Sequence, residues 1–142
     1  MMFLGVDPGK SGGAALINES YQVLSTVKFS VTERDISEWF EQLPDGEISG
    51  VIERVHAMPK QGVASSFKFG MSYGFLRGML IAHEVRFEAV TPGTWQKALG
   101  CLSGGDKNVT RAKASELFPG MRCTHAISDA LLLGVYARRT YR

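Results

Sequence analysis

The stretch LGVDPGKSGGAAL, residues 4–16, places one acid, Asp7, between an apolar run and a glycine-rich turn. Residues 1–6 (MMFLGV) predict a short buried strand, and the Pro-Gly and Gly-Gly pairs predict a tight turn into a second strand over residues 12–18. A carboxylate at the end of a buried strand is held rigidly. Asp7 is either a turn residue whose side chain caps its own backbone or a functional carboxylate, and other features of the sequence are needed to distinguish the two.

Three antiparallel strands are predicted to open the fold, because a third run, residues 21–29, follows the second across a hairpin turn. Thr32 has the position of a helix N-cap, and the helix that it begins ends before a Pro-Asp-Gly turn. A fourth strand, residues 48–52, runs directly into Glu53. Glu53 therefore stands at the end of a strand, as Asp7 does.

The sequence pattern of the second half predicts one more strand and four helices. The predicted order of the whole chain is β-β-β-α-β-α-β-α-α-α. We expect a single α/β domain over residues 1–142, with a mixed five-stranded sheet flanked by helices. The predicted elements of this half are a long helix (62–83), a strand (85–90), a short helix capped by Thr91, a polar loop (102–110), a helix (111–118) and a last helix (125–139).

The composition, 44% hydrophobic and 21% charged in 142 residues, is typical of a globular protein. No apolar run approaches the roughly 18 residues of a membrane span, and none forms a signal-peptide core before Asp7. We therefore expect a cytoplasmic protein with no membrane partner. Cys101 and Cys123 lack the spacing of a zinc site, and we assign them no chemistry.

Charge is distributed unevenly along the chain. Residues 1–53 carry 3 Lys and Arg against 9 Asp and Glu, whereas residues 54–142 carry 13 against 5. A basic second half favours a polyanionic partner, although solvated helix faces give similar counts in proteins that bind no nucleic acid.

Asp7 and Glu53 meet at one edge of the sheet if their strands are neighbours, and open α/β sheets place their sites at that edge. Two carboxylates repel each other unless a divalent cation such as Mg²⁺ joins them. The last helix adds Asp129, with His125 one turn before it on the same face. The alternatives are a carboxylate favoured by the helix dipole for Asp129 and an ordinary surface residue for His125.

Four stretches in this order resemble the landmarks of the RuvC-like Holliday junction resolvases, an RNase H-like nuclease family, and especially its short phage-encoded members. The resemblance covers nearly the whole chain, and the order and spacing are more specific than any single stretch. It implies an RNase H-like fold, a homodimer, dependence on Mg²⁺ or Mn²⁺ with two ions per active site, and symmetrical nicking of branched DNA at four-way junctions. The stretches are GVDPGKSGGAAL (5–16), GVIERVHAMPKQG (50–62), GFLRGML (74–80) and HAISDALLLG (125–134).

By this resemblance Asp7, Glu53 and Asp129 match metal-binding acids. The family's fourth ligand commonly stands three residues before the last acid, and that place is Ala126 here. His125 stands one residue before that place. Position i−4 on a helix is nevertheless as near to Asp129 as position i−3 is. We therefore predict His125 as a fourth metal ligand or a residue that orients water.

Basic residues of the second half are predicted to bind phosphates. Lys107, in GGDKNVTRAK, is predicted to lie near the scissile phosphate, because the family often has lysines in this region. His56 matches a position that relatives place near the junction centre. Each of these residues has the alternative of an exposed surface side chain. The other predicted nucleic-acid contacts are His56, Lys60, Lys68, Arg77, Arg111 and Lys113.

The long helix is the predicted dimer interface, with the alternative that its apolar stripe packs only on its own sheet. Its small residues are Gly70, Ser72, Gly74 and Gly78, and its apolar residues are Met71, Phe75, Met79 and Leu80.

Three other functions compete with junction cleavage. One is an RNase H-like nuclease for structured RNA, and another is a junction-binding protein without catalysis. The third takes residues 7–15 (DPGKSGGAA) as the phosphate loop of an actin-like sugar kinase, for which the chain lacks a second domain.

Overall fold

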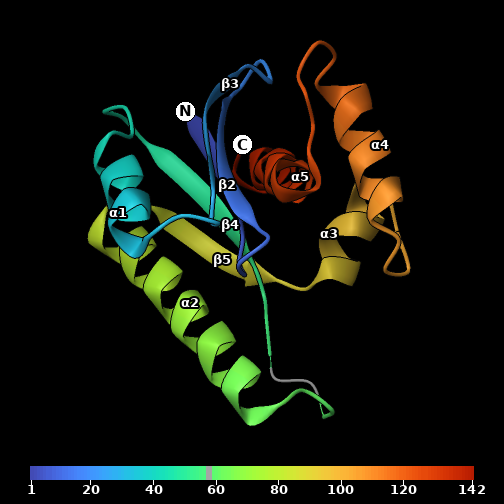
Figure 1. The fold of residues 1–142 in the computed structure, drawn as a ribbon. Coiled ribbons are helices and arrows are strands. Elements are labelled where there is room, and N and C mark those ends of the chain that lie inside the picture. The colour runs from blue at the N-terminus through green and yellow to red at the C-terminus, as the bar shows by residue number, and fades with distance from the viewer. Residues whose placement is uncertain (57–58) are drawn as a thin grey trace.

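The structure is a computed structural model that describes residues 1–56 and 59–142. One mixed sheet contains five strands in the order β3-β2-β1-β4-β5 (Figure 1). β2 is antiparallel to both β1 and β3, and β1, β4 and β5 are parallel. This arrangement confirms the predicted opening meander. The strands are β1 (Met2–Asp7), β2 (Gly13–Asn18), β3 (Val23–Lys28), β4 (Ile48–Glu53) and β5 (Arg86–Val90).

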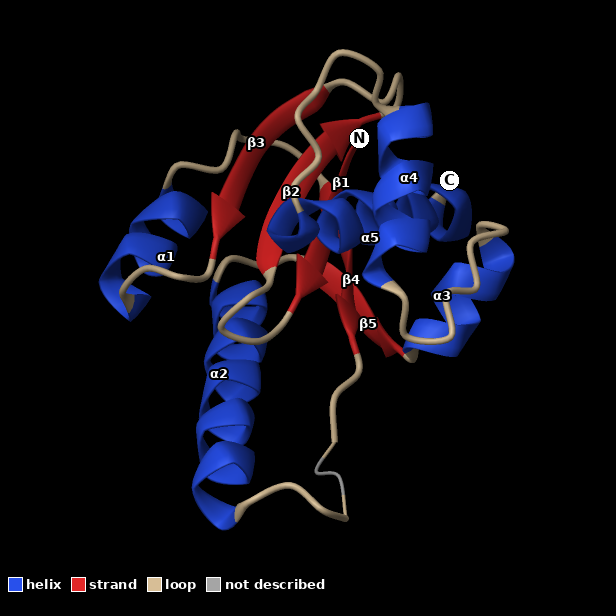
Figure 2. Ribbon diagram, turned by 45° about the vertical axis from the view of Figure 1, so that its right-hand side comes forward, coloured by secondary structure: helices blue, strands red, loops and turns tan. Residues whose placement is uncertain are grey.

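Helices cover both faces of the sheet. Figure 2 shows α1 and α2 on one face and α3, α4 and α5 on the other, and the first half of α2 extends beyond the sheet. The order of helices and strands is the predicted one. The helices are α1 (Glu33–Glu41), α2 (Val63–Ala82), α3 (Pro92–Ala98), α4 (Lys107–Leu117) and α5 (His125–Tyr141).

The alternation of side chains along the strands divides the core in two. Leu4 and Val6 of β1 pack with Leu76 and Leu80 of α2, whereas Phe3 belongs to the core beneath α5. Odd-numbered positions of β1 therefore face α5, and even-numbered positions face α1 and α2.

Gly5 lies where α5 crosses β1. A Cβ atom on Gly5 would collide with the backbone oxygen of Ala130 and the backbone nitrogen of Gly134. Only glycine therefore allows this helix to rest directly on the strand. The apolar run of residues 130–133 is fully buried against the sheet as a result.

The first turn of α4 differs from the prediction. The predicted loop over residues 102–110 ends early, because Asp106 caps the helix by accepting a hydrogen bond from Asn108 N at 3.0 Å. The helix begins at Lys107 and not at residue 111. Lys107 consequently has the fixed backbone of a helix.

In the part of the chain that the structure describes, no helix is both long and apolar enough to cross a membrane.

Candidate active site

The two strand-end acids lie at the same level of the sheet. β1 and β4 pair in parallel from Met2 opposite Ile48 to Val6 opposite Ile52, and Asp7 and Glu53 follow next. Both occupy positions of the strand face that α5 covers, as Val51 does. The prediction that these strands are neighbours is confirmed.

Asp129 approaches this edge from α5. The Oδ1 atom of Asp129 is buried and has no hydrogen-bond partner. Asp7, Glu53, Asp129 and Lys107 all line one cavity of about 810 Å³. The structure thus brings the three predicted acids together with the predicted lysine.

Burial and mutual repulsion destabilise the charged forms of these acids. Burial raises the pKa of Asp7 well above its ordinary value, the charges of Glu53 and Asp129 raise it further, and Lys107 opposes them. Burial also raises the pKa of Glu53, against a hydrogen bond from Trp95 that lowers it. The surroundings of the cavity therefore disfavour the ionised forms of both carboxyl groups.

The pKa of Asp129 is raised by burial as well. A hydrogen bond with the Thr110 side chain lowers it, as do the charges of Lys107 and His125. The first turn of α4 and the first turn of α5 thus both act on this carboxylate.

A divalent cation fits this donor set. The three half-buried carboxylates, one of which has a buried oxygen without a hydrogen-bond partner, are hard ligands, and a cation removes their mutual repulsion. Among residues 1–56 and 59–142, no three side chains of His, Cys, Asp or Glu are already arranged as a metal-binding site. The arrangement suits an ion such as Mg²⁺, which takes one or two carboxylates and completes its shell with water and substrate phosphate.

The glycine-rich turn after β1 packs over Asp7. A Cβ atom on Gly12 would overlap the carbonyl oxygen of Asp7, and Gly12 N donates to Gly9 O at 3.2 Å. This folding of the turn leaves Lys10 and Ser11 on the cavity wall. The sequence indicated a role for these two residues only as part of the phosphate loop of a kinase (residues 7–15).

The predicted basic residues separate into two groups. Lys68 of α2 lines the cavity, as Lys107 does. Arg111 donates a hydrogen bond from Nε to the carbonyl of Cys123 at 3.0 Å, and Lys113 Nζ lies 3.5 Å from Glu116 Oε1. These two residues of α4 make contacts within the protein.

The remaining predicted site residues lie outside the cavity lining. His56 and Lys60 are exposed in the segment after β4, and His125 is exposed at the start of α5. The guanidinium of Arg77 lies 5.7 Å from the ring centre of Tyr73 and 5.5 Å from that of Phe87.

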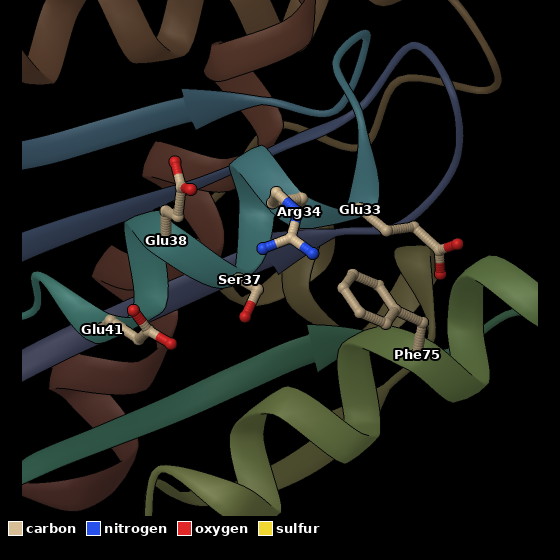
Figure 3. A pocket seen from close by; sticks show the side chains of 6 residues that line it. All are labelled: Glu33, Arg34, Ser37, Glu38, Glu41 and Phe75. Carbon is tan, nitrogen blue, oxygen red and sulfur yellow. The ribbon is translucent and has the colours of Figure 1, made fainter.

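A second hollow, of about 460 Å³, lies between α1 and α2 and is acidic. Figure 3 shows Phe75 of α2 beside the side chains of α1, among which three glutamates stand against one arginine. This surface disfavours a polyanion, so phosphates are better accommodated on the side of Lys68 and Lys107. The residues that line it are Glu33, Arg34, Ser37, Glu38, Glu41 and Phe75.

Trp95 is the contact that sequence reasoning missed. Its indole Nε1 donates a hydrogen bond to Glu53 Oε2 at 2.8 Å, and its side chain is fully buried. The Thr91 cap predicted α3 correctly, but no pattern in a seven-residue helix indicates which side chain faces the site.

No protein-family model and no curated protein matches this chain. RuvC from Thermus thermophilus in complex with a Holliday junction substrate is similar in structure, with a TM-score of 0.68, 15% identity, and coverage of 98% of this chain and 96% of that one. A second Thermus thermophilus RuvC structure gives a TM-score of 0.67 at 16% identity, covering 99% of this chain and 97% of that one. The phage-type assignment stays a prediction. The sheet, its flanking helices and this similarity together show that the chain has the RuvC-like, RNase H-like α/β fold.

Proposed function

We propose that this protein is a metal-dependent, structure-selective DNA endonuclease that nicks four-way junctions. The observation that supports it is the meeting of Asp7, Glu53, Asp129 and Lys107 in one cavity at the carboxyl ends of parallel strands. The fold is that of a protein whose solved complex contains a Holliday junction substrate.

Asp7, Glu53 and Asp129 would hold Mg²⁺ or Mn²⁺, two per active site. The bound ions would supply an activated water and neutralise charge on the attacking and leaving oxygens. His125, which acts electrostatically on Asp129 from one turn away, is proposed as a further ligand or as a residue that orients the water. Lys107 would place a compact positive charge beside the scissile phosphate.

The other basic residues would bind the backbone of the DNA. Lys68 and Lys107 are basic residues of the cavity wall. The other residues lie outside the cavity lining, and all of them are exposed except the half-buried Lys113. Such contacts provide affinity and carry no sequence information. The proposed contacts are His56, Lys60, Lys68, Arg77, Arg111 and Lys113.

A homodimer is part of the proposal, because a four-way junction presents two equivalent phosphodiesters. One face of α2 is apolar and uncovered: Val63 is 90% exposed, Phe67 69% and Ile81 64%. The glycines of the same face, Gly70, Gly74 and Gly78, have nothing within 4 Å of an added Cβ, so a second helix has room to approach.

The predicted dimer interface is corrected in part. Leu80 is fully buried in the protein's own core, and Phe75 and Met79 pack against that core. These residues occupy the side of α2 that covers the sheet. The interface proposed from the structure therefore uses Val63, Phe67, Met71 and Ile81 around the glycines.

Incubation of a labelled four-way junction with the protein in Mg²⁺, Mn²⁺ or EDTA tests the proposed function. We expect paired nicks in either metal and none in EDTA, with a linear duplex of the same sequence left intact. The Asp7→Asn protein should bind the junction without nicking it. Absence of nicking in both metals by the wild-type protein would overturn the proposal.

A junction-binding protein without catalysis is the second candidate, since Ala126 stands at the place of the family's fourth ligand. Binding without nicking in the same experiment would identify it. A labelled RNA hairpin in a parallel reaction tests the third candidate, a nuclease for structured RNA.

A further inference from the structure

Trp95 of α3 and Glu53 of β4 are joined directly across the edge of the cavity. The indole Nε1 donates to Glu53 Oε2 at 2.8 Å. An indole is a donor only, so the carboxylate is the acceptor in this bond whatever else it binds. One of the two oxygens of Glu53 is therefore already engaged by the protein.

The position of the indole ring is fixed by its surroundings. Trp95 is 0% exposed and packs in the core beneath α5 with Val90 and Leu99. Val90 is paired with Glu53 in the sheet, and α3 starts at Pro92, directly after the Thr91 cap. The short path from β5 into α3 thus returns the ring to the end of the neighbouring strand.

This inference rests on the proposed function. We propose that Trp95 is a positioning residue of the metal site: its N–H holds Oε2 of Glu53, so that the other carboxylate oxygen is the one presented to the divalent cation. Groups that hydrogen-bond a metal ligand fix the orientation of that ligand, and their loss typically weakens metal binding about 10- to 100-fold. Trp95 acts through Glu53 and touches no reacting atom.

Because the indole and the cation would bind the same carboxylate, the fluorescence of Trp95 should change when the cation binds. The chain contains two tryptophans, Trp39 and Trp95. Trp39 provides a matched control, since its Nε1 donates to Ser25 Oγ at the same distance, 2.8 Å, from the other face of the sheet. The Trp39→Phe protein leaves Trp95 as the only tryptophan, and Trp95→Phe leaves only Trp39.

The first measurement is tryptophan fluorescence during a titration with Mg²⁺, which does not itself quench indoles. We expect a saturable change in the Trp39→Phe protein. The change should be lost when Glu53→Gln is added, because glutamine keeps the acceptor oxygen and removes the charge. The Trp95→Phe protein should show no change.

The second measurement is the affinity for Mn²⁺ by calorimetry. We expect binding about 10-fold weaker in Trp95→Phe and unchanged in Trp39→Phe. Both substitutions remove one hydrogen-bonded indole N–H, which is buried in Trp95 and half-buried in Trp39. Thermal stabilities of both proteins in EDTA separate an effect on metal binding from a loss of packing.

The outcomes distinguish the two proposals. A wild-type protein that binds neither metal overturns the proposed function and this role with it. A wild-type protein that binds metal, together with unchanged Mn²⁺ affinity in Trp95→Phe, overturns the positioning role alone. Where Trp95→Phe fails to fold, the Mg²⁺ titration of Trp39→Phe decides: a saturable change that depends on Glu53 supports the role, and a flat signal overturns it.

Discussion

Gly5 of β1 and Gly134 of α5 touch through their backbones, and the two sides of the contact are not equivalent. A Cβ atom on Gly134 would lie 3.7 Å from Gly5 N and 3.6 Å from the side chain of Ile17, which is ordinary contact. A Cβ atom on Gly5 would overlap the backbone of the helix. The strand side tolerates no side chain, whereas the helix side tolerates a methyl group.

We therefore expect Gly5→Ala to lower the free energy of unfolding by about 3 kcal/mol or more, because the clash is with backbone that cannot rotate away. Gly134→Ala should be neutral or stabilise by up to about 1 kcal/mol, since alanine is the better helix former. Urea unfolding of the two proteins measures both values. Equal stability of the pair would contradict this account of the crossing.

Replacement of Asp7 should stabilise the metal-free protein at neutral pH. The pKa of Asp7 is raised in the folded state, so the folded protein binds the proton more tightly than the unfolded chain. Ionisation of Asp7 therefore lowers the free energy of unfolding. This destabilisation is absent below the ordinary pKa, near 4, and grows as the pH rises toward the folded pKa. In EDTA, the melting temperature of Asp7→Asn should exceed that of the wild type by more at pH 8 than at pH 4.5.

The same comparison with Asp35→Asn serves as the control, because the Thr32 side chain lowers the pKa of Asp35. That substitution should destabilise the protein at pH 8, the opposite direction. A constant difference between wild type and Asp7→Asn across the pH range would contradict the prediction.

Metal should stabilise the wild-type protein in a pH-dependent way. A cation binds the ionised carboxylates and competes with the protons that their raised pKa values favour. Addition of Mg²⁺ or Mn²⁺ should raise the melting temperature at pH 8 and raise it less at pH 5.5. Asp129→Asn should lose most of the effect. A shift of equal size in that variant would place the bound metal elsewhere.

Lys107 should contribute one charge to junction affinity. Each phosphate that the protein neutralises adds roughly −0.9 to the slope of log affinity against log salt concentration. Lys107→Ala should therefore make the slope shallower by about one unit. Lys28→Ala, at the exposed end of β3 and outside the cavity lining, is the control and should leave the slope unchanged. Fluorescence anisotropy at several salt concentrations measures both.

The outward face of α2 should hold the dimer together. Phe67 is 69% exposed on that face, and an aspartate there would place a charge in the proposed interface. Phe67→Asp should be a monomer by light scattering at micromolar concentration, with junction nicking reduced. Leu102→Asp, at a residue 65% exposed outside the helix, should remain a dimer. A monomeric wild-type protein, alone and with junction DNA, would contradict the dimer.

Local signals in the sequence were sufficient for the individual strands and for singling out the three acids. Asp7 and Glu53 each end an apolar run. Whether those runs are neighbours was left open by the sequence, and the parallel pairing in the structure brings both acids to one edge. Asp129 stood out because it is an acid beside a leucine stripe. These positions follow from strand and helix periodicity, which a single sequence displays directly.

The helix α2 shows where periodicity fails. Its apolar residues lie on more than one side: Leu80 is fully buried and the next residue, Ile81, is 64% exposed. A helix that is apolar on several sides carries no pattern that identifies the side covering its own sheet. The bond from Trp95 to Glu53 was equally inaccessible, because it joins residues 42 apart and depends on how α3 packs.

The ladder between β1 and β4 has a further consequence for the site. Neighbouring strands lie about 4.8 Å apart, and two catalytic metals typically lie about 4 Å apart, so backbone hydrogen bonding alone supplies carboxylates at a spacing suited to a metal pair. Asp7 and Glu53 follow the last paired residues, Val6 and Ile52, before either loop begins. The loops that follow Asp7 and Glu53 are therefore free to change in length and sequence while this spacing stays constant. An inserted residue within β4 itself would instead turn Glu53 to the opposite face of the sheet and remove it from the site.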